Sequence, residues 1–108
     1  MVKSSGKLLQ ILAFLLAATP VAAQDVRQGH AIARQWCSGC HQVELAARPP
    51  KNVAPSFLLV AQDPATTRIS LAAFLSSSHQ NMPDFSLTRQ EIRDVSAYIL
   101  SLHRAEQP

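Results

Sequence analysis

Cysteine and long apolar runs are scarce in this chain of 108 residues. It contains two cysteines, Cys37 and Cys40, so a zinc site with four ligands would need scattered histidines to complete it. The apolar run over residues 8–18 is broken only by Gln10 and falls well short of the ~20 residues that a membrane span requires. No internal repeat is present. These absences argue against a zinc protein and against a membrane-spanning chain.

Residues 1–23 have the pattern of a secretory signal peptide. Lys3 and Lys7 give a positive start, an apolar stretch follows, and the small residues 21–23 suit peptidase cleavage before Gln24. We therefore expect export, most simply to the periplasm, and one mature domain over residues 24–108, which is 108 − 23 = 85 residues long.

The mature domain is close to electrically neutral. The whole chain has ten Lys plus Arg and seven Asp plus Glu, and two of the ten lie in the leader, which leaves 8 − 7 = +1. No basic patch remains that would favour nucleic acid or an anionic membrane as a partner. A domain of this size buries a modest core and often depends on disulfides, a metal or a cofactor.

Residues 37–41 have the sequence Cys-Ser-Gly-Cys-His, the C-x-x-C-H pattern of c-type haem attachment. Residues three apart on a helix share a face, so Cys37 and Cys40 can form thioethers with two neighbouring vinyl groups of one porphyrin. His41, on the same turn, can give one ring nitrogen to iron and keep the other for a hydrogen bond. The pattern occurs once and therefore predicts one haem.

Three other uses of a cysteine pair stay open from the pattern alone. C-x-x-C also occurs in dithiol redox proteins, as a half-site for zinc and as a short-loop disulfide. The redox fold is disfavoured because no alternating strand pattern surrounds Cys37. Zinc would need other ligands at irregular spacings, drawn from His30, His79 and His103.

Hydrophobic periodicity predicts an all-α fold with four helices. They are expected at 25–38, at 54–61 before Asp63-Pro64, at 70–78, and from Thr88 to about residue 103. The first helix has an apolar stripe that we expect to face the core and haem, formed by Val26, Gly29, Ala33, Trp36, Cys37 and Cys40.

Two features of the predicted helices and loops allow more than one interpretation. Gly29 in mid-helix indicates either close passage of another backbone or a tolerated surface glycine. Arg48 and Lys51, in the loop over 42–54, either contact a haem propionate or are simply solvated.

Met82 is the single methionine outside the leader, and it lies in a predicted loop over 79–87. Methionine is usually a core filler, but Pro83 restricts the backbone of Met82, and a stiff loop thioether suits a distal iron ligand that raises the reduction potential. His79 is either a competing ligand or an exposed loop residue. We expect His30 and His103 to lie on the surface.

Four segments together resemble the small bacterial class I cytochromes c. They are residues 29–41, 53–57, 81–87 and 95–102, which carry C-x-x-C-H, an Ala-Pro-Ser-Phe stretch, Met-Pro and a terminal Ala-Tyr helix. The resemblance implies a cytochrome c fold in which the N- and C-terminal helices cross near right angles around one covalently attached haem.

The same resemblance implies roles for individual residues. Cys37 and Cys40 would attach the haem c, and His41 and Met82 would be the axial ligands. The carbonyl of Pro55 would accept the ring N–H of His41, and Gly29 would meet the region of Tyr98.

The function expected from this site is transfer of single electrons between redox partner proteins. With both axial positions filled by protein, no open position remains for catalysis, so we expect no enzyme activity. One alternative is a dedicated haem c subunit of a periplasmic dehydrogenase or oxidase. Another is a gas-binding sensor or peroxidatic haem protein, if Met82 is not a ligand, and a thiol-disulfide protein is the last.

Overall fold

The computed structural model describes residues 24–45 and 54–106. The expected leader and the loop with Arg48 and Lys51 lie outside the described residues. The helical elements are α2 (Val26–Ile32), η1 (Ala33–Cys37), α3 (Phe57–Gln62), α4 (Arg68–Leu75) and α5 (Arg89–Ala105). The described residues form no strand, and their one β contact is an isolated bridge between His79 and Met82. The predicted all-α fold is confirmed.

Side-chain caps explain where the helices begin. Asp25, Ser56, Thr67 and Thr88 each accept backbone N–H groups of the first turn. The predicted capping box of α5, Thr88 with Glu91, is present. The third helix begins at Arg68, two residues earlier than predicted, because a capping box between Thr67 and Ser70 starts it.

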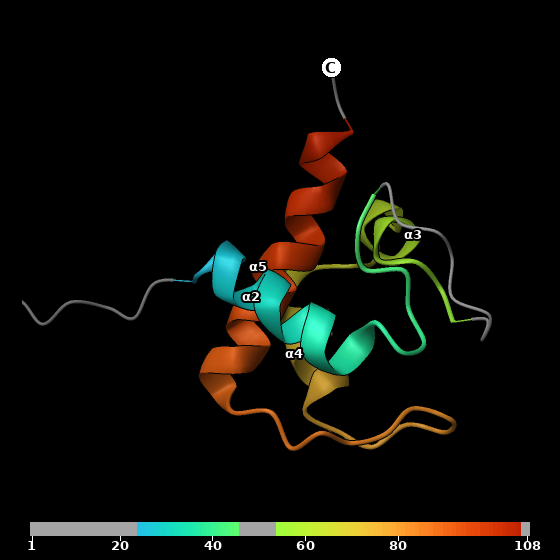
Figure 1. The fold of residues 1–108 in the computed structure, drawn as a ribbon, viewed down its shortest axis with the longest axis vertical. Helices are drawn as coiled ribbons and strands as arrows, with labels where there is room; N and C mark the ends of the chain where they lie inside the picture. The colour runs from blue at the N-terminus through green and yellow to red at the C-terminus, as the bar shows by residue number, and fades with distance from the viewer. Residues whose placement is uncertain (1–23, 46–53, 107–108) are drawn as a thin grey trace, which may run out of the picture.

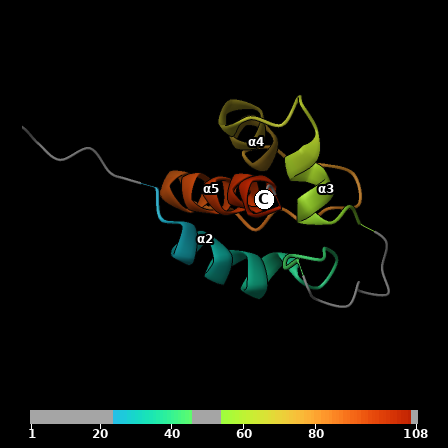
Figure 2. The same ribbon diagram turned by 90° about the horizontal axis from the view of Figure 1, so that it is seen from above.

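Helix α5 is the centre of the fold, and α2, α3 and α4 all pack on it. It lies between α2 on one side and α4 on the other (Figure 2), and α2 crosses it near its middle (Figure 1). At the crossing, a Cβ atom on Gly29 would lie 1.9 Å from the carbonyl oxygen of Asp94 and 2.9 Å from Cβ of Tyr98. Gly29 is therefore the point of close backbone approach, and the surface-glycine alternative is wrong.

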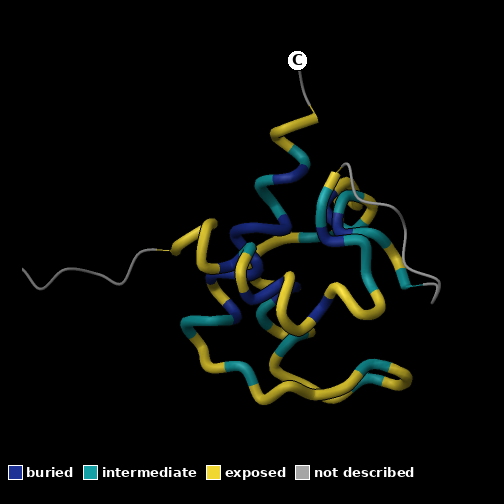
Figure 3. Tube along the Cα trace, viewed as in Figure 1, coloured by how far each residue is buried: buried dark blue, intermediate teal, exposed yellow. Residues whose placement is uncertain are grey.

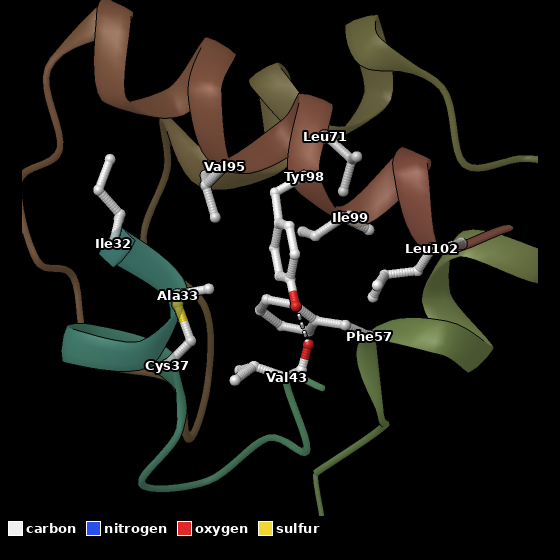
Figure 4. Packing of buried hydrophobic residues seen from close by; sticks show 11 residues of the cluster. Ile32, Ala33, Cys37, Val43, Phe57, Leu71, Val95, Tyr98, Ile99 and Leu102 are labelled. Atoms are coloured by element: carbon white, nitrogen blue, oxygen red, sulfur yellow. Dashed lines mark hydrogen bonds between the residues drawn. The ribbon is translucent and has the colours of Figure 1, made fainter. Parts of the chain in front are cut away.

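The core is built around the apolar stripe of α5 (Figure 4). Fully burying a Val, Leu, Ile or Phe side chain is worth about 1.5–3 kcal/mol relative to exposure. The buried cluster comprises Ile32, Ala33, Cys37, Val43, Phe57, Ala61, Leu71, Val95, Tyr98, Ile99 and Leu102.

A buried carboxylate also joins the two crossing helices. Asp94 is 3% exposed, and its Oδ1 accepts hydrogen bonds from the Asp25 amide at 2.9 Å and from Gln90 Nε2 at 2.8 Å. In a local capping box, the Gln28 side chain would accept the amide of Asp25. Here that amide donates to Asp94 of α5 instead.

The predicted first helix is divided, because its second half is a π-helical turn. Ser38 donates its amide to the carbonyl of Ala33, five residues back, at 3.0 Å. This extra residue in the turn changes which side chains face the core. Ile32, which the predicted stripe leaves out, is buried, while Val26 is 39% and Trp36 43% exposed, so neither Val26 nor Trp36 is part of the protein core.

Candidate functional site

The C-x-x-C-H segment forms one tight helical turn that follows η1. The amides of Cys40 and His41 both donate to the carbonyl of Cys37, at 3.2 and 2.9 Å. The hydroxyl of Ser38 donates to the carbonyl of Arg34 at 2.5 Å and closes the end of the π-helical turn. Cys37, Cys40 and His41 are therefore brought together on one short turn, as the spacing predicts.

The two thiols lie in different surroundings and form no disulfide with each other. Cys37 is buried beside Ala33 in the core cluster (Figure 4), whereas Cys40 is exposed. Burial raises the pKa of the Cys37 thiol to about 11. At neutral pH this thiol is protonated, so it behaves as a small apolar group of the core.

The ring of His41 is held on its Nδ1 side. Nδ1 donates to the carbonyl of Pro55 at 2.6 Å, the bond that the resemblance implies. A carbonyl can only accept, so Nδ1 carries the proton and Nε2 has a lone pair available for a metal. The ring also contacts Phe57 at a centroid distance of 5.2 Å and an angle of 46°.

The loop that presents Pro55 is fixed to the His41 segment by backbone contacts. The amide of Phe57 donates to the carbonyl of Gln42 at 2.9 Å, which joins the start of α3 to the residue after His41. The Tyr98 hydroxyl donates to the carbonyl of Val43 at 2.7 Å (Figure 4), which fixes the same segment to α5. The position of His41 therefore depends on both α3 and α5.

Met82 lies in the loop between α4 and α5, which runs below the C-x-x-C-H turn in the view of Figure 1. Its half-buried side chain lines a small hollow with Phe74, His79, Phe85 and Leu87. Phe85 contacts Trp36 at a centroid distance of 5.3 Å, so this loop is joined to η1 directly beside Cys37.

Comparison with known proteins places this chain among cytochromes. Residues 24–99 match the family described as cytochrome c oxidase, cbb3-type, subunit III. The chain is also 37% identical over 92 residues to cytochrome c-552 of Bradyrhizobium diazoefficiens, an alignment that covers 85% of this chain and 88% of that protein. The chain is a small monohaem class I cytochrome c. No solved structure matches it significantly.

The residues of this cytochrome fit a haem group. Two thiols and an imidazole with an available Nε2 lie on one turn, and a thioether lies in the loop joined to that turn through Trp36 and Phe85. Aromatic side chains near the turn and the Met82 loop also stay partly exposed and could pack on a large apolar cofactor: Trp36, Phe74 and Phe85. No three His, Cys, Asp or Glu side chains of residues 24–45 and 54–106 cluster in a way that could hold a metal ion by themselves.

The three remaining histidines of the cytochrome, His30, His79 and His103, are each partly buried. His30 stacks on Tyr98 at a centroid distance of 4.7 Å, and its Nε2 lies 2.8 Å from Glu44 Oε1. Burial, and then the charge of Glu44, raise the pKa of the Tyr98 hydroxyl. His79 stacks on Phe74, a contact that the spacing of the sequence does not reveal.

Two aromatic residues of the site have no role that the sequence predicts. Phe57 falls in the predicted helix over 54–61, and its contact with His41 depends on the loop that brings α3 back to the C-x-x-C-H turn. Phe85 falls in the predicted loop over 79–87, and its position three residues after the candidate ligand is the signal that the sequence offers.

Proposed function

We propose that this cytochrome carries single electrons between redox partners in the periplasm. In this proposal Cys37 and Cys40 attach one haem c covalently, and His41 and Met82 ligate its iron. The observation that carries the proposal is the 2.6 Å bond from His41 Nδ1 to the Pro55 carbonyl, because it orients the ring and leaves Nε2 as the donor.

When bound, haem c supplies an iron that accepts and releases one electron. The chain's own residues keep this site constant in shape. The Pro55 carbonyl fixes the tautomer of His41 and strengthens it as a donor, and Pro83 restricts the backbone of Met82. Buried Cys37 and Val43 exclude water from the core side of the turn.

Occupation of both axial positions by protein supports a carrier without enzyme activity. The pattern of residues 1–23 supports export by a cleaved signal peptide. In the described part of the chain, no helix is sufficiently long and apolar to span a bilayer.

A second candidate is a subunit of a terminal oxidase, and the description of the matching family favours it. Exposed apolar side chains on α3 and α4 are compatible with a partner, since Leu59 is 62% and Ile69 83% exposed. Stable co-purification of the chain with an oxidase from its native membrane would support this role. Recovery of the free cytochrome alone would support a diffusing carrier.

Absorption spectroscopy of the haem-loaded protein and of Met82→Ala tests the proposed ligands. We expect a weak far-red sulfur-to-iron band in the oxidised wild type and its loss in Met82→Ala. The potential of the variant should fall by about 100 mV or more, because axial ligands shift haem potentials over roughly 0.8 V. Gln80→Ala, in the same loop, is the control and should retain both. A band and a potential that survive in Met82→Ala would rule out the assignment.

A further inference from the structure

His79 is one of the few half-buried residues between α4 and α5. From Ser76 to Thr88 the half-buried side chains are those of His79, Met82 and Leu87, and the others are exposed (Figure 3). An otherwise exposed loop thus has a side chain packed inward three residues before the candidate ligand.

The ring of His79 is held at its edge and on its face by one residue of α4. Nε2 donates to the carbonyl of Phe74 at 2.7 Å, and Ser77 Oγ lies 3.3 Å from the same nitrogen. The ring stacks on that of Phe74 at a centroid distance of 3.6 Å and an angle of 6°. Nε2 is therefore engaged with the last turn of α4, and the ring face is covered by Phe74, so the side chain of His79 is anchored on that helix.

A tight turn transmits this anchor to Met82. The amide of Met82 donates to the carbonyl of His79 at 3.3 Å, and Asn81, the third residue of the turn, has φ of 64°. A type II turn requires a positive φ at this position and favours Gly or Asn there. Pro83 restricts Met82 from the other side, so the backbone of Met82 has little freedom relative to His79.

The other end of the loop is anchored separately. Phe85 packs on Trp36, and Asp84 Oδ1 accepts the amide of Ser86 at 2.8 Å. Met82 lies between these two anchors, one on α4 and one on η1. Loss of the His79 anchor would free one end of the loop and leave the other in place.

We propose that His79 is a positioning residue for Met82. It fixes the turn on the end of α4 so that the thioether is presented to the haem iron, and it is not itself a ligand. This inference rests on the proposed ligation by His41 and Met82.

Imidazole titration of the oxidised, haem-loaded protein measures this effect directly. Imidazole can bind the iron only when the Met82 thioether is released. A variant that shifts the loop toward the released state should therefore bind imidazole more tightly by the same factor. The hydrogen bond and the stacking contact are each expected to contribute roughly a three- to tenfold factor. His79→Ala removes both and should raise imidazole affinity about ten- to hundredfold, with a weaker far-red band.

Two further variants separate the contacts. His79→Phe keeps an aromatic ring for stacking on Phe74 and lacks the donor, whereas His79→Gln keeps an N–H donor and lacks the stack. Both should bind imidazole more tightly than the wild type and less tightly than His79→Ala. Gln80→Ala, an exposed position of the same turn, is the matched control and should stay within about twofold of the wild type.

The possible results distinguish this inference from the ligand assignment. If the wild type shows the far-red band and His79→Ala binds imidazole no more tightly than Gln80→Ala does, the positioning role is overturned and the ligand assignment stands. A wild type without the band would overturn the proposed ligation and this inference with it. If His79→Ala does not fold, wild-type affinity in both His79→Phe and His79→Gln would overturn the positioning role.

Discussion

Gly29→Ala tests the crossing of α2 and α5 most directly. The added Cβ would lie 1.9 Å from the carbonyl oxygen of Asp94, 2.4 Å from its carbonyl carbon and 2.9 Å from Cβ of Tyr98. An ordinary contact between carbon and oxygen is about 3.3 Å or longer. Two of the three atoms belong to the helical backbone and cannot rotate away, so the helices must separate by about 1.4 Å, the difference between 3.3 and 1.9 Å.

Separation on this scale weakens the contacts that hold the N-terminal helix in place. A gap of about 0.5–1 Å forfeits a quarter to a half of the dispersion energy of each contact. Overpacking typically costs about 1–3 kcal/mol, and the absence of a flexible neighbour at Gly29 places this case at the upper end. Replacing glycine by alanine inside a helix also stabilises the helix by about 1 kcal/mol, which offsets part of this cost. The expected net loss is therefore about 2 kcal/mol of unfolding free energy.

Denaturation of the haem-loaded protein followed by circular dichroism measures this loss. For a domain of this size about 2 kcal/mol corresponds to a fall in Tm of roughly 8–16 °C. Ala31→Gly, on the exposed face of the same helix, is the control, and it should cost only the propensity term of about 1 kcal/mol. A Gly29→Ala protein as stable as the wild type would refute the close crossing.

Two further predictions concern α5. The pKa of Tyr98 is higher in the folded protein than in the unfolded chain, so the unfolded chain loses the hydroxyl proton first as the pH rises. The contribution of Tyr98 to stability should therefore be constant below about pH 10. It should fall above that pH, as the pH approaches the higher pKa of the folded protein. Tyr98→Phe, which leaves the Val43 carbonyl without its donor, should remove this alkaline loss and cost about 1–2 kcal/mol at pH 7 in chemical denaturation; an unchanged alkaline loss in the variant would contradict the assignment. Asp94→Ala should lower the unfolding free energy by about 3 kcal/mol, because the Asp25 amide and Gln90 Nε2 lose their buried acceptor. Asp94→Asn retains Oδ1 and should cost clearly less. Equal losses in the two variants would contradict this role of Asp94.

The elements that the sequence predicts well are those specified by neighbouring residues. The Thr88 and Glu91 side chains define the start of α5 locally, and Asp63 before Pro64 defines the end of α3. The C-x-x-C-H turn is equally local, because its hydrogen bonds stay within five residues. Such features need no knowledge of the rest of the fold.

The features that the sequence does not reveal depend on partners far along the chain. Asp25 is 69 residues from Asp94, and Val43 is 55 residues from Tyr98, so neither pair has a spacing that marks it. The π-helical turn after Ile32 is missed because a count of three and four residues per turn assumes a regular helix.

Helix α5 relates the two halves of the candidate site to each other. His41 is held by the Pro55 carbonyl ahead of α3 and by the segment fixed to Tyr98, while Met82 is held from the end of α4. The main helix contacts of α3 and of α4 are both with α5, and Phe57 and Leu71 pack in the cluster around it (Figure 4). The separation of imidazole and thioether is therefore set by packing on α5, together with the contact of Phe85 with Trp36 beside the C-x-x-C-H turn. This arrangement explains how a small helical domain can present two side chains from distant loops with little backbone freedom.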